Sequence, residues 1–103
     1  MILEVAILNV KTGEEARFEV TFAKARSIII GTNGYISHQL QKYIENPNKY
    51  VLLVNWQTLE DHTIGFRGSQ PYKAWKEILH HYYDPLPTVE RYQLVFGNSA
   101  IKS

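Results

Sequence analysis

The chain has 103 residues, a length that suits one domain, and its 11 basic and 10 acidic side chains leave a formal charge of +1. These charges are interleaved, so no basic surface for nucleic acid is predicted. The chain contains no cysteine, which excludes disulfides, thiolate metal ligands and cysteine nucleophiles, and its apolar runs fall far short of the ~20 residues of a spanning helix. We therefore expect a cytoplasmic protein without a nucleic acid or membrane partner.

The first third of the chain predicts a strand and then a helix. Residues 2–10 are rich in β-branched and large apolar side chains, which favours a strand. Thr12 and Glu15 have the spacing of a capping box, which predicts a helix that begins there and stops at the turn around Gly31. Apolar residues at helical spacing predict one buried stripe on this helix: Phe18, Phe22, Ala25 and Ile29.

A β-hairpin is predicted next. Residues 35–44 alternate apolar and polar side chains, and residues 49–56 are a second strand-like run. Residues 45–48 between them have the asparagine and proline content of a turn. The two strands are therefore expected to pair as antiparallel neighbours.

Two short helices and a last strand complete the pattern. Thr58 and Asp61 form a helix-entry pair, and Ser69 followed by Pro71 predicts a second helix start. The second helix carries an apolar stripe rich in aromatic rings: Tyr72, Trp75, Leu79 and Tyr82. After a loop with two prolines, residues 88–96 suit a strand.

This order of elements predicts an α+β fold of the ferredoxin-like type, a split βαβ sandwich with helices on one face of an antiparallel sheet. We assign one domain to residues 1–96 and a loose tail to residues 97–103. Both alternations of the first and third strands are apolar, so both faces of the sheet are expected to be buried. A homodimer packed sheet against sheet would bury the second face.

The segment from Val54 to Trp75 crowds aromatic, cationic and imidazole side chains around the two helix starts, a composition typical of a small-molecule pocket. The candidate walls for a flat ring are aromatic: Trp56, Phe66, Tyr72 and Trp75. Plain core packing would give the same stripe. His80 and His81 are adjacent and lie about 100° apart on a helix, so they do not chelate one metal from a single face. No glycine-rich phosphate loop follows a strand, so we predict neither a metal nor a flavin cofactor.

The ordered set of local patterns resembles the antibiotic biosynthesis monooxygenase family over about residues 1–95. The patterns are K-T-G at 11–13, Gly34-Tyr35, the run 50–56, T-L-E-D-H at 58–62, F-R-G-S at 66–69, Tyr72 with Trp75, and H-H-Y-Y-D-P-L-P-T-V-E at 80–90. The resemblance implies a dimeric α+β barrel with a pocket in each subunit between the sheet and its helices. It also implies oxygenation of phenolic or quinol-type substrates without metal or flavin.

The related haem-degrading branch uses an asparagine on the first strand and a tryptophan and a histidine on the later helices. Alignment on the Gly13 turn and on Ser69 places Ala6, Phe66 and Lys76 at those positions, so the haem ligand would be lost. The leading interpretation is therefore a monooxygenase-like protein for a small aromatic or quinol metabolite. The alternatives are a non-catalytic or lyase/isomerase-type ligand-binding barrel and a haem-binding or haem-degrading relative.

Cofactor-free oxygenation requires that the protein remove a phenolic or enolic proton and hold the resulting anion. His62 is the candidate base because its ordinary pKa of ~6.5 suits proton transfer at neutral pH. Arg67 is the candidate partner of the anion, since a guanidinium is always charged and presents a fork of donors. The competing interpretation of His62 is a histidine that caps or packs at a helix surface. That of Arg67 is an exposed arginine or one in a subunit-interface ion pair. His80 and His81 are the next candidates for the base.

Overall fold

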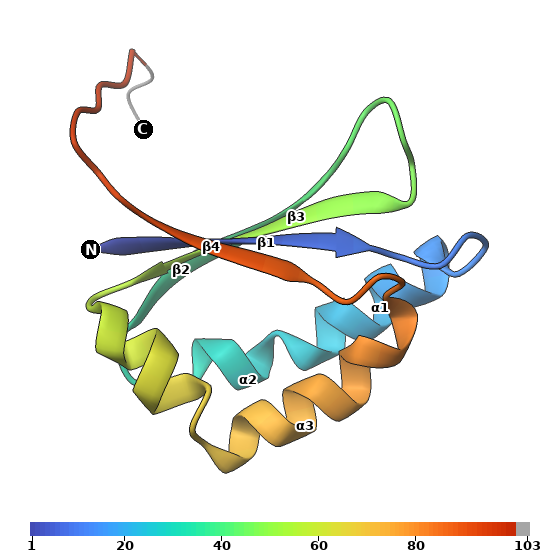
Figure 1. The fold of residues 1–103 in the computed structure, drawn as a ribbon, viewed down its shortest axis with the longest axis horizontal. Coiled ribbons are helices and arrows are strands. Elements are labelled where there is room, and N and C mark those ends of the chain that lie inside the picture. The colour runs from blue at the N-terminus through green and yellow to red at the C-terminus, as the bar shows by residue number, and fades with distance from the viewer. Residues whose placement is uncertain (101–103) are drawn as a thin grey trace.

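The protein, described here over residues 1–100 by a computed structural model, is a four-stranded antiparallel sheet with every helix on one face (Figure 1). The elements follow the order β1 (Ile2–Asn9), α1 (Glu15–Ala25), α2 (Ser27–Ile30), β2 (Tyr35–Lys42), β3 (Lys49–Trp56), η1 (Asp61–Phe66), α3 (Gln70–Leu79), η2 (His80–Tyr82) and β4 (Thr88–Gln93). This arrangement confirms the predicted fold class.

The sheet order is β2-β3-β1-β4, which places β1 and β3 at the centre and β2 and β4 at the edges. All neighbouring strands are antiparallel, as a split βαβ sandwich requires. The register sets Ala6 opposite Leu52 on one side and opposite Val89 on the other. Side chains from three strands therefore meet on the same face of the sheet.

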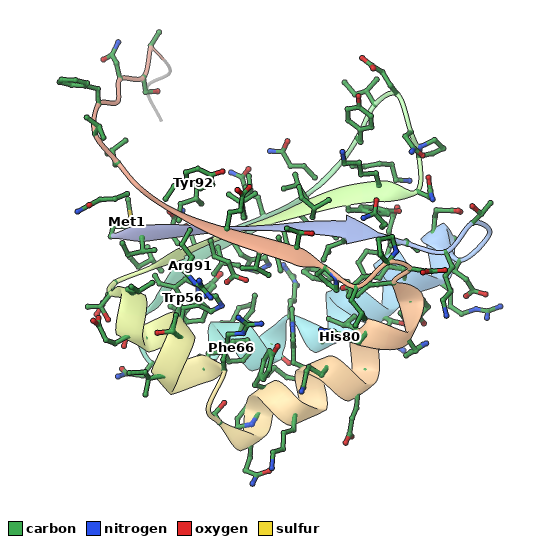
Figure 2. The ribbon with its side chains drawn as sticks, in the orientation of Figure 1. Met1, Trp56, Phe66, His80, Arg91 and Tyr92 are labelled. Carbon is green, nitrogen blue, oxygen red and sulfur yellow. The ribbon has the colours of Figure 1, made fainter. Side chains whose placement is uncertain are left out.

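Strand alternation divides the sheet into a covered face, toward the helices, and an open face. The covered-face positions of β1 and β3 are buried: Glu4, Ala6 and Leu8, with Tyr50, Leu52, Val54 and Trp56. The predicted helical stripe packs against them, because Phe18, Phe22, Ala25 and Ile29 are all buried. The alternate positions of β1 and β3 are only half-buried, and Tyr92 on β4 points to this open side (Figure 2).

The first helix begins later than its predicted cap. Thr12 caps nothing in the structure: α1 begins at Glu15, and no side chain caps its first turn. Instead the Glu15 carboxylate accepts the backbone N–H of Gly13, at 2.9 Å to either oxygen. The Gly13 backbone has a φ of +91°, a turn conformation that would strain other residues. The predicted single helix is also interrupted at Arg26, between α1 and α2.

Both later helix starts have the predicted caps. Thr58 and Asp61 form a reciprocal box, each side chain accepting the other residue's backbone N–H at 3.1 Å. Ser69 accepts the backbone N–H of Tyr72 at 3.3 Å, as an N-cap does. The first of these helices is a π-helix, a wider turn that often marks functional sites. A side chain at Gly34 would collide with Asp61, so glycine allows the β2 start to approach this cap.

Two strands are shorter than predicted. β2 ends at Lys42 and β4 ends at Gln93, where the chain leaves the sheet on the side away from the helices (Figure 1). Residues 94–100 form no helix or strand, and Leu94, Val95 and Phe96 are 67%, 81% and 92% exposed. The remainder of the predicted loose tail, residues 101–103, lies outside the described residues. In the described part of the chain, no helix is long and apolar enough to cross a membrane.

Candidate functional site

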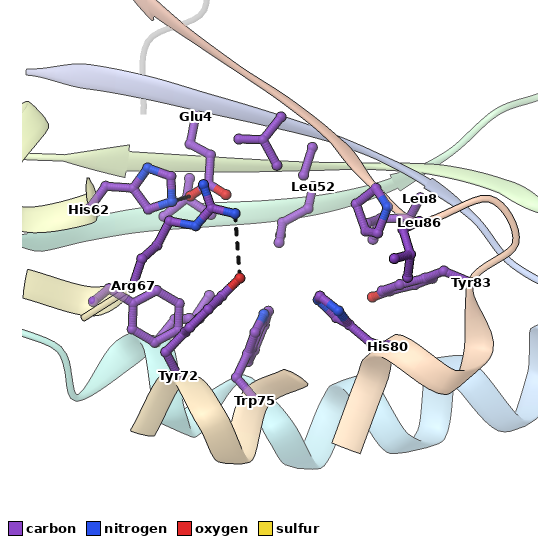
Figure 3. Close-up of a pocket in the computed structure, with 16 residues that line it drawn as sticks. Glu4, Leu8, Leu52, His62, Arg67, Tyr72, Trp75, His80, Tyr83 and Leu86 are labelled. Carbon is purple, nitrogen blue, oxygen red and sulfur yellow. Dashed lines mark hydrogen bonds and ion pairs between the residues drawn. The ribbon is translucent and has the colours of Figure 1, made fainter. Parts of the chain in front are cut away.

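A cavity of about 230 Å³ lies between the covered face of the sheet and the helices that follow β3 (Figure 3). Strand β1 supplies its sheet wall together with β3, while η1 and α3 supply the opposite wall. The loop before β4 supplies one end through Leu86 and Pro87. The cavity is therefore lined by residues from elements along most of the chain, from Glu4 to Val89.

Three of the four predicted aromatic walls line this cavity. Phe66, at the end of η1, meets Trp75 edge to face at 6.0 Å and Tyr72 at 5.2 Å between ring centroids. Trp75 also meets Phe22 of α1 at 5.8 Å, which fixes its ring against the core. Because Ser69 caps α3, the two α3 rings project from the first turns of a rigid helix. These three rings therefore form an aromatic slot on the helix side of the cavity.

Trp56, the fourth predicted wall, does not line the cavity. Its side chain is fully buried behind the cavity, where its ring stacks on His62 at 5.5 Å with an interplanar angle of 16°. It also stacks on Phe66 at 5.8 Å. Its Nε1–H points to the polar end of the cavity and donates to Glu4 Oε1 at 3.0 Å. Trp56 therefore supports the site from behind.

Glu4 on β1 is the acidic group of the cavity, and it is only 8% exposed. Burial raises its pKa above the ordinary value, because a carboxylate loses hydration there. The Trp56 hydrogen bond and the charges of Arg67 and Arg91 oppose that rise in pKa. A buried carboxyl with a raised pKa is a common form of acid or base catalyst.

His62 lies beside this carboxyl and is 2% exposed. Its Nδ1 accepts the Nε–H of Arg91 at 3.2 Å, and its Nε2 lies 3.3 Å from Glu4 Oε1. Since an arginine only donates, the neutral imidazole carries its proton on Nε2, toward Glu4. Burial, Arg91 and Arg67 together lower the His62 pKa to about 4. The predicted base is therefore a neutral histidine without a free lone pair at neutral pH.

Arg67 lines the cavity at the same end as Glu4 and His62 (Figure 3). One of its terminal nitrogens donates to the Tyr72 hydroxyl at 3.4 Å, and its guanidinium lies 5.7 Å from the centre of the Tyr72 ring. The residue is exposed, so its side chain contacts both the cavity and solvent. It is placed to meet an anionic oxygen that enters the slot.

The opposite end of the cavity carries His80 and Tyr83. Burial and the charges of Lys76 and Arg67 lower the pKa of His80, and burial raises the pKa of Tyr83. Their rings lie 5.7 Å apart. His81 is exposed and packs on Tyr82 at 4.1 Å, outside the cavity. The adjacent histidines therefore diverge, as their spacing predicts.

The sequence-based prediction includes neither Glu4, which lines the cavity, nor Arg91, which donates to His62 beside it. They come from opposite ends of the chain, yet they are register partners across β1 and β4. One signal for Glu4 was present in the sequence: it occupies the same strand alternation as Ala6 and Leu8, which the structure buries. A charged residue at an inward strand position is the informative exception to burial patterns. Within residues 1–100, no three histidine or acidic side chains are grouped to hold a metal ion.

Comparison with protein families identifies the family to which this fold belongs. The family model described as antibiotic biosynthesis monooxygenase matches residues 1–78, which include β1, the hairpin, η1 and most of α3. The chain belongs to this family. The antibiotic biosynthesis monooxygenase match covers Glu4, His62, Arg67 and the three cavity rings, whereas Arg91 lies beyond it.

Among similar proteins, the uncharacterized protein YczJ of Bacillus subtilis is 54% identical over 93 residues, 90% of this chain and 98% of its own. A crystal structure from Bordetella bronchiseptica, assigned to the same family, has a TM-score of 0.88 at 33% identity and covers 92% of this chain and 97% of its own. SnoaB, a cofactor-independent oxygenase from Streptomyces nogalater, has a TM-score of 0.68 at 20% identity over 98% and 97% of the two chains. At that identity SnoaB shares the fold.

Proposed function

We propose that the protein is a cofactor-independent monooxygenase that acts on a small phenolic or quinol-type ring bound in the cavity. The observation that carries this proposal is the lining of the cavity, in which aromatic rings lie beside a polar end formed by Glu4, His62 and Arg67. The walls suit a planar ring, and the polar end suits its ionising oxygen. Membership of a monooxygenase family supports the reaction type.

The reaction needs no group beyond substrate and dioxygen. Removal of the phenolic proton leaves a phenolate, whose electron-rich ring can reduce O₂. When a phenol becomes a quinone, the ring supplies all four electrons: one oxygen atom becomes the new carbonyl, and the other leaves as water with two substrate hydrogens. The protein's contribution is to take the phenolic proton, hold the anion and exclude water.

The size of the cavity limits the substrate to a small ring system. A cavity of ~150 Å³ lined by aliphatic and aromatic side chains is known to hold benzene. The present cavity of about 230 Å³ is larger than that benzene site but smaller than two of them. It therefore suits one ring with substituents or two fused rings, and it is small for haem.

Arg67 is the proposed partner of the phenolate oxygen, and the cluster of Glu4 with His62 is the proposed proton-accepting end. Arg67 reaches the cavity from the end of η1, and its hydrogen bond to Tyr72 orients the guanidinium over the slot. A fixed guanidinium stabilises a developing oxyanion more strongly in a partly dehydrated slot than in water.

The open face of the sheet is the proposed contact of a homodimer. Its centre presents Leu3, Val5, Ile7, Val51 and Leu53, all half-buried in one chain. Monomers rarely expose such contiguous apolar surface, and a second copy would bury it on a two-fold axis. Light scattering at low micromolar concentration tests this proposal. A folded species at 12.0 kDa would contradict it.

Oxygen uptake tests the reaction. The purified protein, without added metal or flavin, is incubated with 1,4-hydroquinone, 1,4-naphthohydroquinone, 1-naphthol and anthrone, and dioxygen consumption is compared with that of the free compounds. For at least one of the smaller rings we expect uptake above background and a product that has gained one oxygen atom, a quinone from 1-naphthol or a hydroxyquinone from a hydroquinone. A plain quinone formed from a hydroquinone together with hydrogen peroxide would contradict oxygen insertion. Binding without uptake would instead identify a non-catalytic or isomerase-type barrel, and a Soret band on addition of hemin would identify a haem protein.

A further inference from the structure

We infer that Glu4 is the catalytic base of this site and that His62 is a positioning residue that holds the Glu4 carboxylate. This inference rests on the proposed function and assigns the proton acceptor within it. Glu4 lines the cavity, and the contacts made to its carboxyl in the described part of the chain reach Oε1, from Trp56 and from His62. Oε2 is thus the oxygen that remains for a ligand.

His62 is excluded as the acceptor by its own contacts. A base needs an unoccupied lone pair within reach of the substrate proton. The Nδ1 lone pair of His62 is used by Arg91 at 3.2 Å, and Nε2 carries the imidazole proton toward Glu4. The ring also stacks on Trp56, which favours the orientation in which both nitrogens make these contacts. The same contacts fix the Glu4 carboxyl from one side.

Burial strengthens Glu4 as a proton acceptor, whereas the Trp56 hydrogen bond and the arginine charges that face it act against this. From η1 the group faces His62 and Arg67, from β4 it faces Arg91, and from β3 it accepts the Trp56 N–H. Burial raises the Glu4 pKa, which strengthens it as a base relative to an exposed carboxylate. After transfer the carboxyl is neutral and the negative charge lies on the substrate oxygen. Arg67 is positioned to pair with that oxygen.

The step is a proton transfer with no change of oxidation state. The O–H bond of the phenol breaks, a new O–H bond forms at Glu4 Oε2, and the electron pair stays on the substrate oxygen. Oxidation of the phenolate by dioxygen follows, as in the proposed function. In the final state the proton held by Glu4 is available to the reduced oxygen atom that leaves as water.

Paired substitutions separate the two residues kinetically. Glu4→Gln keeps a side-chain oxygen for the Trp56 N–H but removes the base, so kcat on a weakly acidic phenol should fall by about 10²–10⁴-fold. The loss should shrink on nitrophenols that are already ionised at the assay pH, which a merely structural defect would not produce. His62→Gln keeps an N–H donor toward Glu4 without a basic nitrogen, so kcat should stay within about tenfold of wild type. Glu77→Gln, on the exposed side of α3, is the matched control.

A binding experiment decides the assignment even if no compound is oxidised. 4-Nitrophenol is titrated with protein below the pKa of the free phenol, phenolate is measured by absorbance, and proton release is measured by calorimetry in two buffers. In wild type the phenolic proton stays on Glu4. Glu4→Gln should therefore release about one more proton per bound phenolate than wild type and Glu77→Gln.

Several results would overturn the assignment. They are equal proton release by wild type and Glu4→Gln, binding of the nitrophenol in wild type only as the neutral phenol, or full turnover by Glu4→Gln on a weakly acidic phenol. A loss of 10²–10⁴-fold in folded His62→Gln with little loss in Glu4→Gln would return the role to His62. Absence of oxygen uptake by wild type, with the proton difference intact, would contradict the proposed function but leave the Glu4 assignment standing.

Discussion

The two faces of the sheet break opposite rules of burial. On the covered face, a carboxyl and an imidazole are buried among apolar side chains: Glu4 is 8% and His62 2% exposed. On the open side, apolar side chains remain in contact with solvent, including Tyr92 at 49% and Met1 at 62% exposure (Figure 2). Exposed single hydrophobic residues are ordinary, but a buried polar cluster and a contiguous apolar face are not.

The difference indicates what each face is for. Buried charged groups cost free energy unless they are paired, and the Glu4 cluster is paired only in part, around a cavity. That free-energy cost is understandable where the groups act on a ligand. The centre of the open face instead presents half-buried aliphatic side chains from β1 and β3. We therefore propose that the covered face serves chemistry and that the open face serves association.

Adjacent residues on β3 give the largest test of this contrast. Leu52 points into the core and Leu53 to the open face. Leu52→Asp would bury an unpaired charge, so it should cost more than about 4 kcal/mol and leave little folded protein. Leu53→Asp should keep the far-UV circular dichroism of the fold but shift the species seen by light scattering toward one subunit. Equal behaviour of the two variants would remove the distinction between the faces.

The faces could be predicted because they follow from local signals. Strand alternation and the 3.6-residue spacing of Phe18, Phe22 and Ile29 depend only on neighbours in sequence. The caps at Thr58 and Ser69 are local as well. The error at Thr12 arose because Glu15 bonds the Gly13 N–H alone, so half of the capping box is missing. Such a motif predicts that a helix is nearby, but it does not specify the residue at which the helix begins.

The site could be predicted only in part, for a different reason. Phe66, Tyr72 and Trp75 share two consecutive helices, so spacing alone gathers them. The meeting of Glu4 with Arg91 depends on β4 pairing with β1, which no local pattern specifies. Whether a ring faces the cavity or lies behind it depends on tertiary packing, which the sequence pattern does not specify. The pattern therefore predicts Trp56 as a cavity wall, whereas the structure places it behind His62.

The two buried tryptophans, Trp56 on β3 and Trp75 on α3, should differ in the next largest effect. Trp56→Ala leaves a void in the core and deprives Glu4 of its N–H donor, so unfolding in urea should show a loss near the upper end of ~3–5 kcal/mol. Trp75 already borders a cavity, so Trp75→Ala should cost less stability and should raise KM for the substrate. A larger stability loss for Trp75→Ala would mean that its ring is core rather than wall.

The buried imidazole should make stability depend on pH. The His62 pKa is lowered from 6.5 to about 4, so in mild acid the unfolded chain binds a proton that the folded chain does not. Its contribution is therefore present above pH ~6.5 and is lost as the pH falls through ~4, at most about 3 kcal/mol. The raised pKa of Glu4 changes stability with pH in the opposite direction. Glu4 is present in both wild type and His62→Gln, so a comparison of these two proteins isolates the contribution of His62.

His62→Gln removes that titration while retaining a polar side chain at the site. Urea unfolding at pH 7 and pH 4.5 should show the variant less stable than wild type at pH 7, with a smaller difference at pH 4.5. The matched change on the open side, Tyr92→Phe, removes an exposed hydroxyl and should leave the pH dependence of wild type unchanged. A constant difference between His62→Gln and wild type at both pH values would show that His62 is not held neutral.

The smallest expected effect concerns Arg67, which borders solvent and the cavity together. Arg67→Lys keeps the positive charge but loses the planar fork that reaches Tyr72 and the substrate oxygen. Because the side chain is exposed, the free energy of unfolding should change by no more than about 0.5 kcal/mol. kcat/KM should fall by about tenfold, equivalent to ~1.4 kcal/mol of transition-state stabilisation. Lys73→Arg, on the exposed side of α3, keeps the charge outside the cavity and should alter neither quantity. If Arg67→Lys matches that control in steady-state kinetics, Arg67 does not hold the anion, and of these two groups only Glu4 contributes to the reaction at the polar end of the cavity.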